Sequence, residues 1–320
     1  MSSQYFLGVD GGQSGTTAII GDENGHVLGR GVGGPSNHAG AAEGQAKFVN
    51  AIRASVGEAC MQAGLEGWVR FFSSCLGFSG GPADKQVLLG QILTSDHVLL
   101  TDDATIALAG ALAGEPGIVV IAGTGSIAFG RNVQGRTARA GGWGYLFGDE
   151  GGAFWIVREA VRAALGWEEG WGSPTALRAI LLDATGARNM NDLMHRCYTP
   201  EFPRPSIASL ALQVNYAAEV GDPVARQILR DAARELAVLA RAIQNQLFNG
   251  SESVPCAYVG GVFHSRGLRS GFREAVEREP GLVATAPVHD PAFGALLEAY
   301  RSVGTIPYGI RQPFVVRRLG

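Results

Sequence analysis

Two stretches of this chain repeat one pattern: a short apolar segment, a glycine-rich polar turn and a second extended segment that ends in another turn. The first stretch spans residues 5–32, and the second spans residues 117–135. Apolar runs bounded by glycine, and an Asn-Gly pair at Asn24-Gly25, predict β-hairpins. The repetition favours an internal duplication of this unit.

Hydrophobic periodicity predicts the elements around these hairpins. Strands are expected at 5–10, 16–21, 26–32, 71–76, 98–100, 118–122, 127–132 and 256–259, and helices at 45–63, 85–93, 104–113, 206–220, 223–247 and 291–301. The long helix at 223–247 has Asp222 as a good N-cap and Pro223 at its first position. This order predicts two α/β domains, which we expect at residues 1–114 and 115–320. The final helix near 290–303 can pack back on the first domain, although no spacing in the sequence requires it.

Composition excludes several classes of protein. The chain has 320 residues with 46% apolar and 17% charged residues, so it can bury a large core. We expect no membrane span, no signal peptide and a cytoplasmic protein. A net charge of −3 gives no basic face for nucleic acid. The cysteines are single and scattered, which argues against a zinc, iron–sulfur or disulfide framework: Cys60, Cys75, Cys197 and Cys256.

The 47 glycines, about twice the usual share of ~7%, gather in four turns. Two of them, 11–15 and 123–125, follow apolar strands and could hold the two ends of a polyphosphate through backbone N–H groups. Asp10, at a strand end, suits Mg²⁺ bound through water. Neither turn is a Walker A loop or a Rossmann loop, and a tight polar hairpin is the alternative. The turn at Gly260-Gly261 could accept a flat ring, or simply end a strand.

The densest turn, residues 141–152, combines six glycines with aromatic and acidic side chains. Ionised Asp149 and Glu150 could accept hydrogen bonds from sugar hydroxyls, the alternative being a glycine-rich surface loop. Asp102 and Asp103 follow the strand at 98–100, where a carboxylate could accept a hydroxyl proton during phosphoryl transfer. The side chains of adjacent residues in an extended chain point in different directions, so the two acids cannot both face the same site. The alternative role for either acid is to cap the following helix.

Four motifs in chain order resemble the N-acetylglucosamine kinase family, within the BadF/BadG/BcrA/BcrD-type ATPase group of the acetate kinase–hexokinase–heat-shock-protein–actin superfamily. They are LGVDGGQSGTTAII, LLTDDATIALAG, VVIAGTGSIAFGRN and GGWGYLFGDEGGAFWI, with YVGGVF as a fifth match. The resemblance spans roughly residues 5–300. It implies two actin-like, ribonuclease H-like domains, each with a central mixed sheet, and ATP and sugar in the cleft between them.

The resemblance also implies an activity and its residues. The activity is ATP-dependent phosphorylation of the 6-hydroxyl of an amino sugar, most simply N-acetyl-D-glucosamine, by a homodimer that uses ATP and Mg²⁺. The implied residues are Asp103 as catalytic base; Asn37, Asp103, Gly142, Trp143, Gly144, Asp149 and Glu150 for the sugar; Gly11, Gly12, Gln13, Ser14, Thr124 and Gly125 for the phosphates; Gly260 and Gly261 for the adenosine; and Asp10 for the metal.

Two departures from the family pattern, Gln13 and the Gly152-Ala153-Phe154-Trp155 run, bear on the sugar rather than on the reaction. The alternatives that keep the chemistry are glucosamine, N-acetylmuramic acid and N-acetylmannosamine as substrates. Alternatives of another class are an activator-type ATPase and a non-catalytic sugar sensor. The scattered cysteines argue against the activator, which holds an iron–sulfur cluster, and the full set of acids argues against the sensor.

Overall fold

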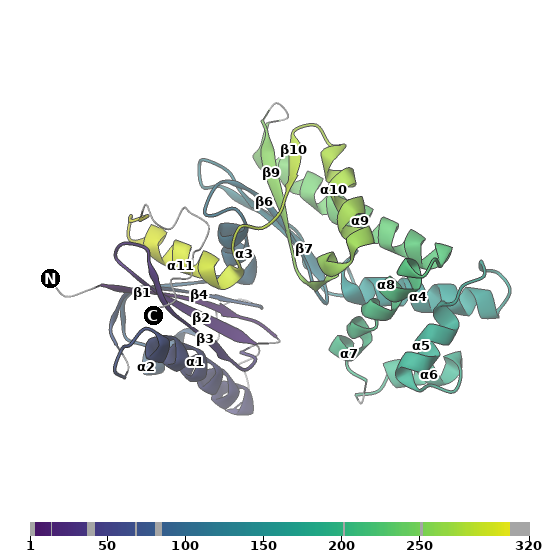
Figure 1. The fold of residues 1–320 in the computed structure, drawn as a ribbon, viewed down its shortest axis with the longest axis horizontal. Helices are drawn as coiled ribbons and strands as arrows, with labels where there is room; N and C mark the ends of the chain where they lie inside the picture. Colours follow the sequence, from purple (N-terminus) through teal and green to yellow (C-terminus); the bar gives the residue numbers. More distant parts are fainter. Residues whose placement is uncertain are drawn as a thin grey trace. The chain divides into compact units, whose positions relative to one another are not determined.

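The computed structural model describes residues 4–13, 15–36, 42–67, 69–80, 85–200, 202–249 and 252–307. The chain forms two compact units (Figure 1). The first contains Met1–Glu115 and Ala286–Gly320, and the second contains Pro116–Thr285. The segment from Ala286 onward therefore belongs to the first unit, although it comes last in the sequence.

The first unit is built on a five-stranded mixed sheet. Its strands are β1 (Tyr5–Gly11), β2 (Thr16–Asp22), β3 (Val27–Gly33), β4 (Phe71–Phe78) and β5 (Ser95–Asp102), in the spatial order β3-β2-β1-β4-β5. The first three strands are antiparallel, as the hairpin signals predict, and β1, β4 and β5 are parallel. The carboxyl ends of β1, β4 and β5 therefore meet at one edge of the sheet.

Helices cover both faces of this sheet (Figure 1). Leu7 and Val9 pack with α1 (Ala42–Gln62), whereas Phe6 packs with α11 (Pro291–Ser302), because successive strand residues point to opposite faces. The rings of Phe6 and Tyr300 stack at 4.1 Å between centroids. The remaining helices of this unit are α2 (Gln86–Ile92) and α3 (Asp103–Ala111), and α3 packs against α11. This packing explains why the last helix joins the first unit.

The second unit repeats the topology of the first. Its strands are β6 (Gly117–Ala122), β7 (Ser126–Arg131), β8 (Thr137–Gly141), β9 (Val254–Val259) and β10 (Leu282–Thr285), in the order β10-β9-β6-β7-β8. Here too the three strands nearest in sequence are antiparallel, and the other two join parallel to the first. The repeated pattern seen in the sequence thus corresponds to a repeated sheet, and the predicted fold of two mixed-sheet domains is confirmed.

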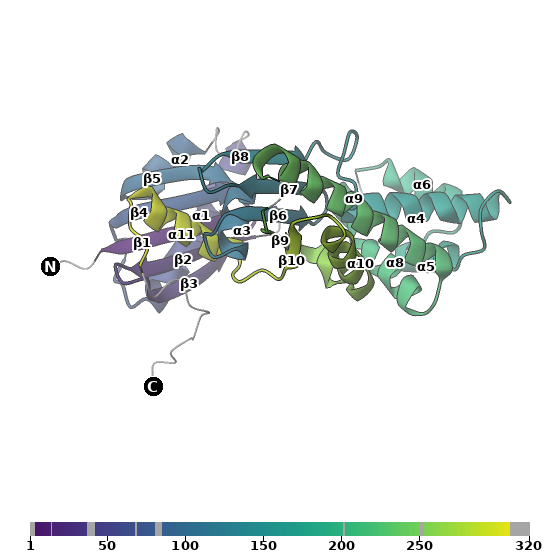
Figure 2. The same cartoon turned by 90° about the horizontal axis from the view of Figure 1, so that it is seen from above.

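The second unit also carries most of the helices (Figure 2). The long helix α9 (Pro223–Leu247) begins at the predicted cap, where Asp222 Oδ1 accepts from Ala225 N at 2.8 Å. It packs on β6, β7 and β8 and beside α8 and α10. The others are α4 (Ala153–Glu168), α5 (Leu177–Thr185), α6 (Met190–Cys197), α7 (Arg204–Ser209), α8 (Ala211–Glu219), the 3₁₀ turn η1 (Gly261–His264) and α10 (Arg266–Glu277).

One predicted helix is wrong in detail. The apolar spacing at 206–220 predicts a single helix, but the structure divides it into α7 and α8, which meet at Leu210. Buried apolar residues continue from α7 into α8, Ala208 and Val214 among them, so the apolar spacing does not mark the break.

In the part of the chain that the structure describes, no helix is long and apolar enough to cross a bilayer.

Candidate active site

The glycine turn after β1 is tight and stays close to its neighbours. Gly12 N donates to Gly15 O at 2.9 Å, and Ser36 N donates to Gly12 O at 3.2 Å. A Cβ on Gly11 would lie 2.4 Å from the ring of Phe78, so only glycine fits there. Gln13 is exposed at the tip. Ser14 and Asn37, both predicted to touch ligands, lie outside the described residues.

Asp10, next to this turn, is partly buried at the end of β1. Burial, which is the largest cause, and the nearby carboxylates of Asp103 and Asp290 together raise the pKa of Asp10 to about 7. Arg30 acts in the opposite direction. The first unit therefore gathers three carboxylates and one guanidinium near the carboxyl edge of its sheet.

The structure separates the roles of the two neighbouring acids Asp102 and Asp103. Asp102 is exposed and caps α3, because its Oδ1 accepts from Thr105 N at 2.7 Å. Asp103 is the first residue of α3, and its Oδ2 accepts from Ser79 Oγ at 2.5 Å. Asp102 is therefore the N-cap of α3, whereas Asp103 does not cap the helix and is held by Ser79 at the end of the neighbouring strand.

Sequence reasoning missed three residues of this cluster: Ser79, Arg30 and Asp290. Asp290 caps α11 by accepting from Phe293 N at 2.9 Å, and its other oxygen pairs with Arg30 Nη1 at 2.6 Å. An Asp followed by Pro at a helix start is a recognisable capping signal. The approach of Asp290 to Asp10, however, depends on α11 returning to the first sheet, which spacing in the sequence does not reveal.

In the second unit, the turn at 123–125 is joined to the start of α4. Gly123 N donates to Gly125 O at 3.0 Å, which closes the turn. Ala153 N then donates to Gly123 O at 2.9 Å, and Phe154 N to Thr124 O at 3.1 Å. The start of α4, which directly follows the 141–152 loop, is thus hydrogen-bonded to the predicted phosphate turn.

The 141–152 loop needs its glycines. Gly141, Gly142, Gly144 and Gly151 all have positive φ angles between 73° and 79°, a region that other residues rarely adopt. Trp143 is 67% exposed, and the guanidinium of Arg139 lies 4.7 Å from the centre of its ring. The loop therefore presents a large aromatic side chain to solvent on a shaped backbone.

The two acids of this loop have different surroundings. Asp149 is 5% exposed; its Oδ1 accepts from Ser126 N at 3.3 Å, and its Oδ2 pairs with Arg204 Nη2 at 2.5 Å. Glu150 is half-buried, and its backbone oxygen accepts from Ser126 Oγ at 2.6 Å. Arg204 is a further residue that the sequence did not point to, since it lies 55 positions from its partner.

A pocket of about 400 Å³ brings two of the predicted nucleotide turns together in the second unit. Thr124 and Gly261 both line it, with apolar walls from α7, α8 and α10 that include Ala208, Leu212 and Leu268. Gly260 does not line it: it has φ +111°, and its Cβ would lie 2.3 Å from Ala122 O. A mainly apolar pocket with a few polar groups suits a flat heterocycle.

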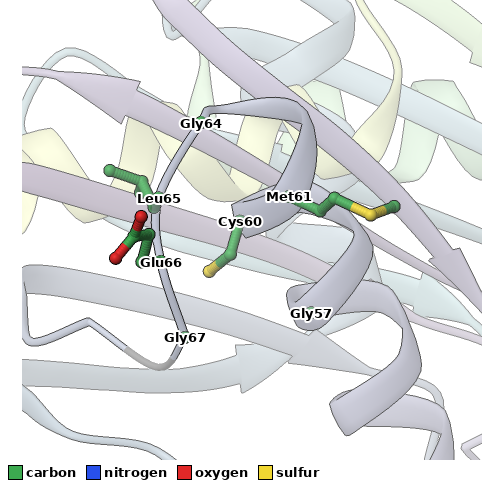
Figure 3. A pocket seen from close by; sticks show the side chains of 7 residues that line it. All are labelled: Gly57, Cys60, Met61, Gly64, Leu65, Glu66 and Gly67. Carbon is green, nitrogen blue, oxygen red and sulfur yellow. The ribbon is translucent and has the colours of Figure 1, made fainter.

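A second hollow, of about 450 Å³, lies in the first unit at the end of α1 (Figure 3). Gly57, Cys60, Met61 and the 64–67 turn line it. The Cys60 thiol is buried, and burial raises its pKa, so it is a poor nucleophile. None of the predicted site residues borders this hollow.

The residues present suit a magnesium ion that arrives with a nucleotide. Among the described residues, no group of three or more His, Cys, Asp or Glu side chains could hold a metal ion. Mg²⁺ usually keeps several waters and binds through one or two carboxylates and substrate phosphates. Asp10, which lies beside a glycine turn with the carboxylate of Asp103 nearby, fits that arrangement.

The repeated sheet and the glycine turn after the first strand of each unit define a protein of the actin-like, two-domain class. The chain belongs to the BadF/BadG/BcrA/BcrD ATPase family, whose model matches residues 7–299. The family predicted from the motifs is thereby confirmed.

Similar proteins cover nearly the whole chain. It is 34% identical over 303 residues to the N-acetylmuramic acid/N-acetylglucosamine kinase of Clostridium acetobutylicum, with 92% of this chain and 98% of that protein covered. It is 30% identical over 318 residues to the N-acetyl-D-glucosamine kinase of Dictyostelium discoideum, with 94% and 99% covered. A Chromobacterium violaceum protein with the provisional name N-acetylglucosamine kinase has a crystal structure with a TM-score of 0.77 and 31% identity, covering 93% of this chain and 99% of that one.

Proposed function

We propose that this protein is an ATP-dependent amino-sugar kinase that transfers the γ-phosphoryl group to the 6-hydroxyl of N-acetyl-D-glucosamine. One observation carries the proposal: two curated relatives, each alike over more than nine-tenths of this chain, are both named as kinases of that sugar. The acids that the chemistry needs are present beside the glycine turns.

Asp103 accepts the proton of the 6-hydroxyl as its oxygen attacks the γ-phosphorus. Its position at the start of α3 supports this role, because its partner Asp102 already caps that helix. The hydrogen bond from Ser79 fixes the direction of the carboxylate. A base held in one orientation loses less entropy when the substrate hydroxyl arrives.

The nucleotide uses both glycine turns. Backbone N–H groups of the 11–15 and 123–125 turns bind phosphate oxygens, and the pocket lined by Thr124 and Gly261 takes the adenosine. Gly125 and Gly260 shape these turns by allowing close approach of the backbone. Asp10, together with water, would hold Mg²⁺, which would neutralise charge on the phosphates.

The sugar is bound by the 141–152 loop and by Asn37. Gly142 and Gly144 let the loop backbone approach the ring, and Trp143 offers an apolar face to it. Glu150 accepts hydrogen bonds from sugar hydroxyls. An ionised carboxylate has about four acceptor positions, so Asp149 retains capacity for a hydroxyl beyond its two protein donors.

N-acetylmuramic acid is a second candidate substrate. The relative from Clostridium acetobutylicum is named for both N-acetylmuramic acid and N-acetylglucosamine. The two sugars differ by a lactyl ether on the 3-oxygen, so the test compares them directly. The homodimer and the cytoplasmic location stay predictions.

A coupled ADP-release assay over hexoses, hexosamines and their N-acetyl forms tests the proposal. We expect stimulation by N-acetylglucosamine, with the product identified as the 6-phosphate by mass spectrometry and ³¹P NMR. N-acetyl-6-deoxyglucosamine serves as the control, because it fits the same site but has no 6-hydroxyl to phosphorylate. Absence of stimulation by every sugar would refute the kinase assignment.

A further inference from the structure

The guanidinium of Arg204 lies at the junction of three segments of the second unit. It forms an ion pair with Asp149 at 2.5 Å and lies 5.0 Å from the ring centre of Tyr145 and 5.8 Å from that of Phe154. The two rings contact each other edge to face, with centroids 5.1 Å apart. Arg204 thus binds both the 141–152 loop and the first turn of α4.

Asp149 depends on this partner. It is one of two described non-glycine residues with a positive φ, here 63°, so it adopts a conformation that costs energy unless neighbours hold it. Its carboxylate is buried against the 123–125 turn, where a Cβ on Gly125 would lie 2.3 Å from Asp149 Oδ2. Removing the partner of a buried charge is costly, because the remaining charge is left uncompensated. Arg204 therefore keeps Asp149 in place beside the phosphate turn.

The helix that carries Arg204 also forms a wall of the nucleotide pocket. Arg204 is the first residue of α7, and the same helix supplies Pro205, Ala208 and Ser209 to the pocket lining. The helix has six residues and packs beside α4 (Figure 1). So short a helix is unstable alone, and contacts such as this ion pair must fix its position.

We infer that Arg204 is a positioning residue that couples the 141–152 loop to the nucleotide pocket. The inference rests on the proposed function, which gives the loop to the sugar and the pocket to the adenosine. A nucleotide that settles against α7 favours the position in which Arg204 holds Asp149, and this in turn orders the loop for the sugar. Sugar and nucleotide should therefore strengthen each other's binding by the same factor.

Calorimetric titration of ADP, with and without saturating N-acetylglucosamine, measures that factor. We expect sugar to tighten ADP binding by about 5- to 150-fold in the wild type, the usual range for linked sites. In Arg204→Met the factor should fall close to one, and ADP alone should bind at least about tenfold more weakly. Arg204→Lys keeps the charge but not the planar fork, so it should give intermediate values.

Arg178→Met is the matched control. Arg178 pairs with Glu168 at the same 2.5 Å, has a similar exposed fraction, 36% against 32%, and lies in the same unit. Arg178 is not among the residues that line the pocket, and its ion pair joins α5 to the last residue of α4. Its replacement should leave both the coupling factor and the affinity for ADP alone unchanged.

The double variant Asp149→Asn/Arg204→Met keeps the test valid if Arg204→Met alone does not fold. It leaves no unpaired buried charge, so it should fold, and it should still lack coupling. Wild-type coupling in either Arg204→Met or the double variant would overturn the inference. If the wild type phosphorylates no sugar, the proposed function fails. The titration with ADP alone then decides this inference, because unchanged affinity in Arg204→Met would refute it.

Discussion

Ser79 Oγ donates a hydrogen bond to Asp103 Oδ2 at 2.5 Å, and the two residues come from neighbouring strand ends. Ser79 directly follows β4, and Asp103 directly follows β5. The parallel register aligns Phe78 with Asp102, so the next residue of each strand lies at the same edge of the sheet. The topology of the sheet, rather than any local motif, brings the serine to the acid.

Replacing Ser79 with Ala should slow phosphoryl transfer without unfolding the protein. Ser79 fixes the direction of the Asp103 carboxylate, and a misplaced catalytic group can cost about 100-fold, so kcat should fall by about 10- to 100-fold. Steady-state kinetics at saturating sugar and ATP measure this. Ser95→Ala is the control, because Ser95 also hydrogen-bonds through its hydroxyl but begins β5, about 23 Å along the strand from Asp102. Equal kcat in Ser79→Ala and wild type would remove Ser79 from the mechanism.

Asp103→Asn and Asp102→Asn should behave very differently. Asn at position 103 cannot accept a proton, so kcat should fall by about 10²- to 10⁴-fold while the affinity for the sugar stays similar. Asn at position 102 is still a good helix cap and should leave kcat and stability nearly unchanged. Kinetics, calorimetric sugar binding and thermal unfolding of both variants separate these effects. A larger loss of kcat in Asp102→Asn would reverse the two roles.

Much of the fold follows from local sequence patterns. Asn24-Gly25 and the glycine turns predict the hairpins, and Asp222 followed by Pro223 marks the start of α9, as the structure confirms. The return of α11 to the first sheet has no such local signal. It depends on Gly8, whose Cβ would lie 2.2 Å from Leu296 N, and thus on a close packing between residues far apart in the chain.

The candidate site could be predicted where the residue type itself indicates the role. Glycines at strand ends and adjacent acids could be recognised from the sequence, although Asp102 and Asp103 could not be told apart by spacing. The partners of those acids could not be found: Ser79, Arg30 and Arg204 are ordinary polar residues until the fold places them 2.5–2.6 Å from a carboxylate. Hydrogen bonds and ion pairs of this kind join distant segments, and no periodicity encodes them.

Asp10→Asn should stabilise the protein at neutral and alkaline pH. The folded-state pKa of Asp10 is raised to about 7, above its value in the unfolded chain, so the folded protein binds this proton more tightly. The contribution of the Asp10 carboxyl to the free energy of unfolding is therefore largest below about pH 4, and it is lost as the pH rises toward 7. The advantage of Asp10→Asn over wild type should grow by about 2 kcal/mol between pH 5 and pH 8.

Urea unfolding of wild type and Asp10→Asn across this pH range measures the difference, with no nucleotide or Mg²⁺ present. Arg30→Met provides a second check, since Arg30 lowers the pKa of Asp10 and its loss should move the titration to higher pH. A constant difference between wild type and Asp10→Asn from pH 5 to pH 8 would mean that Asp10 is ionised throughout.

Gly260→Ala and Gly261→Ala should have different effects at the end of β9: the first on the free energy of unfolding, the second on ADP binding. At Gly260 a methyl group would meet Ala122 O at 2.3 Å, and the φ of +111° is strained for alanine. We expect Gly260→Ala to lower the free energy of unfolding by at least about 1–3 kcal/mol, or to prevent folding.

Gly261 has room for a side chain, because no atom lies within 4 Å of an added Cβ and its φ is not positive. Gly261→Ala should therefore keep the free energy of unfolding within about 0.5 kcal/mol of wild type. Because Gly261 lines the pocket that we assign to the adenosine, the new methyl group should weaken ADP binding by roughly fivefold or more. Urea unfolding and ADP titration of the two variants check both expectations. A stable Gly261→Ala with wild-type affinity for ADP would place the adenosine elsewhere, since a ligand packed against this turn cannot tolerate the added volume.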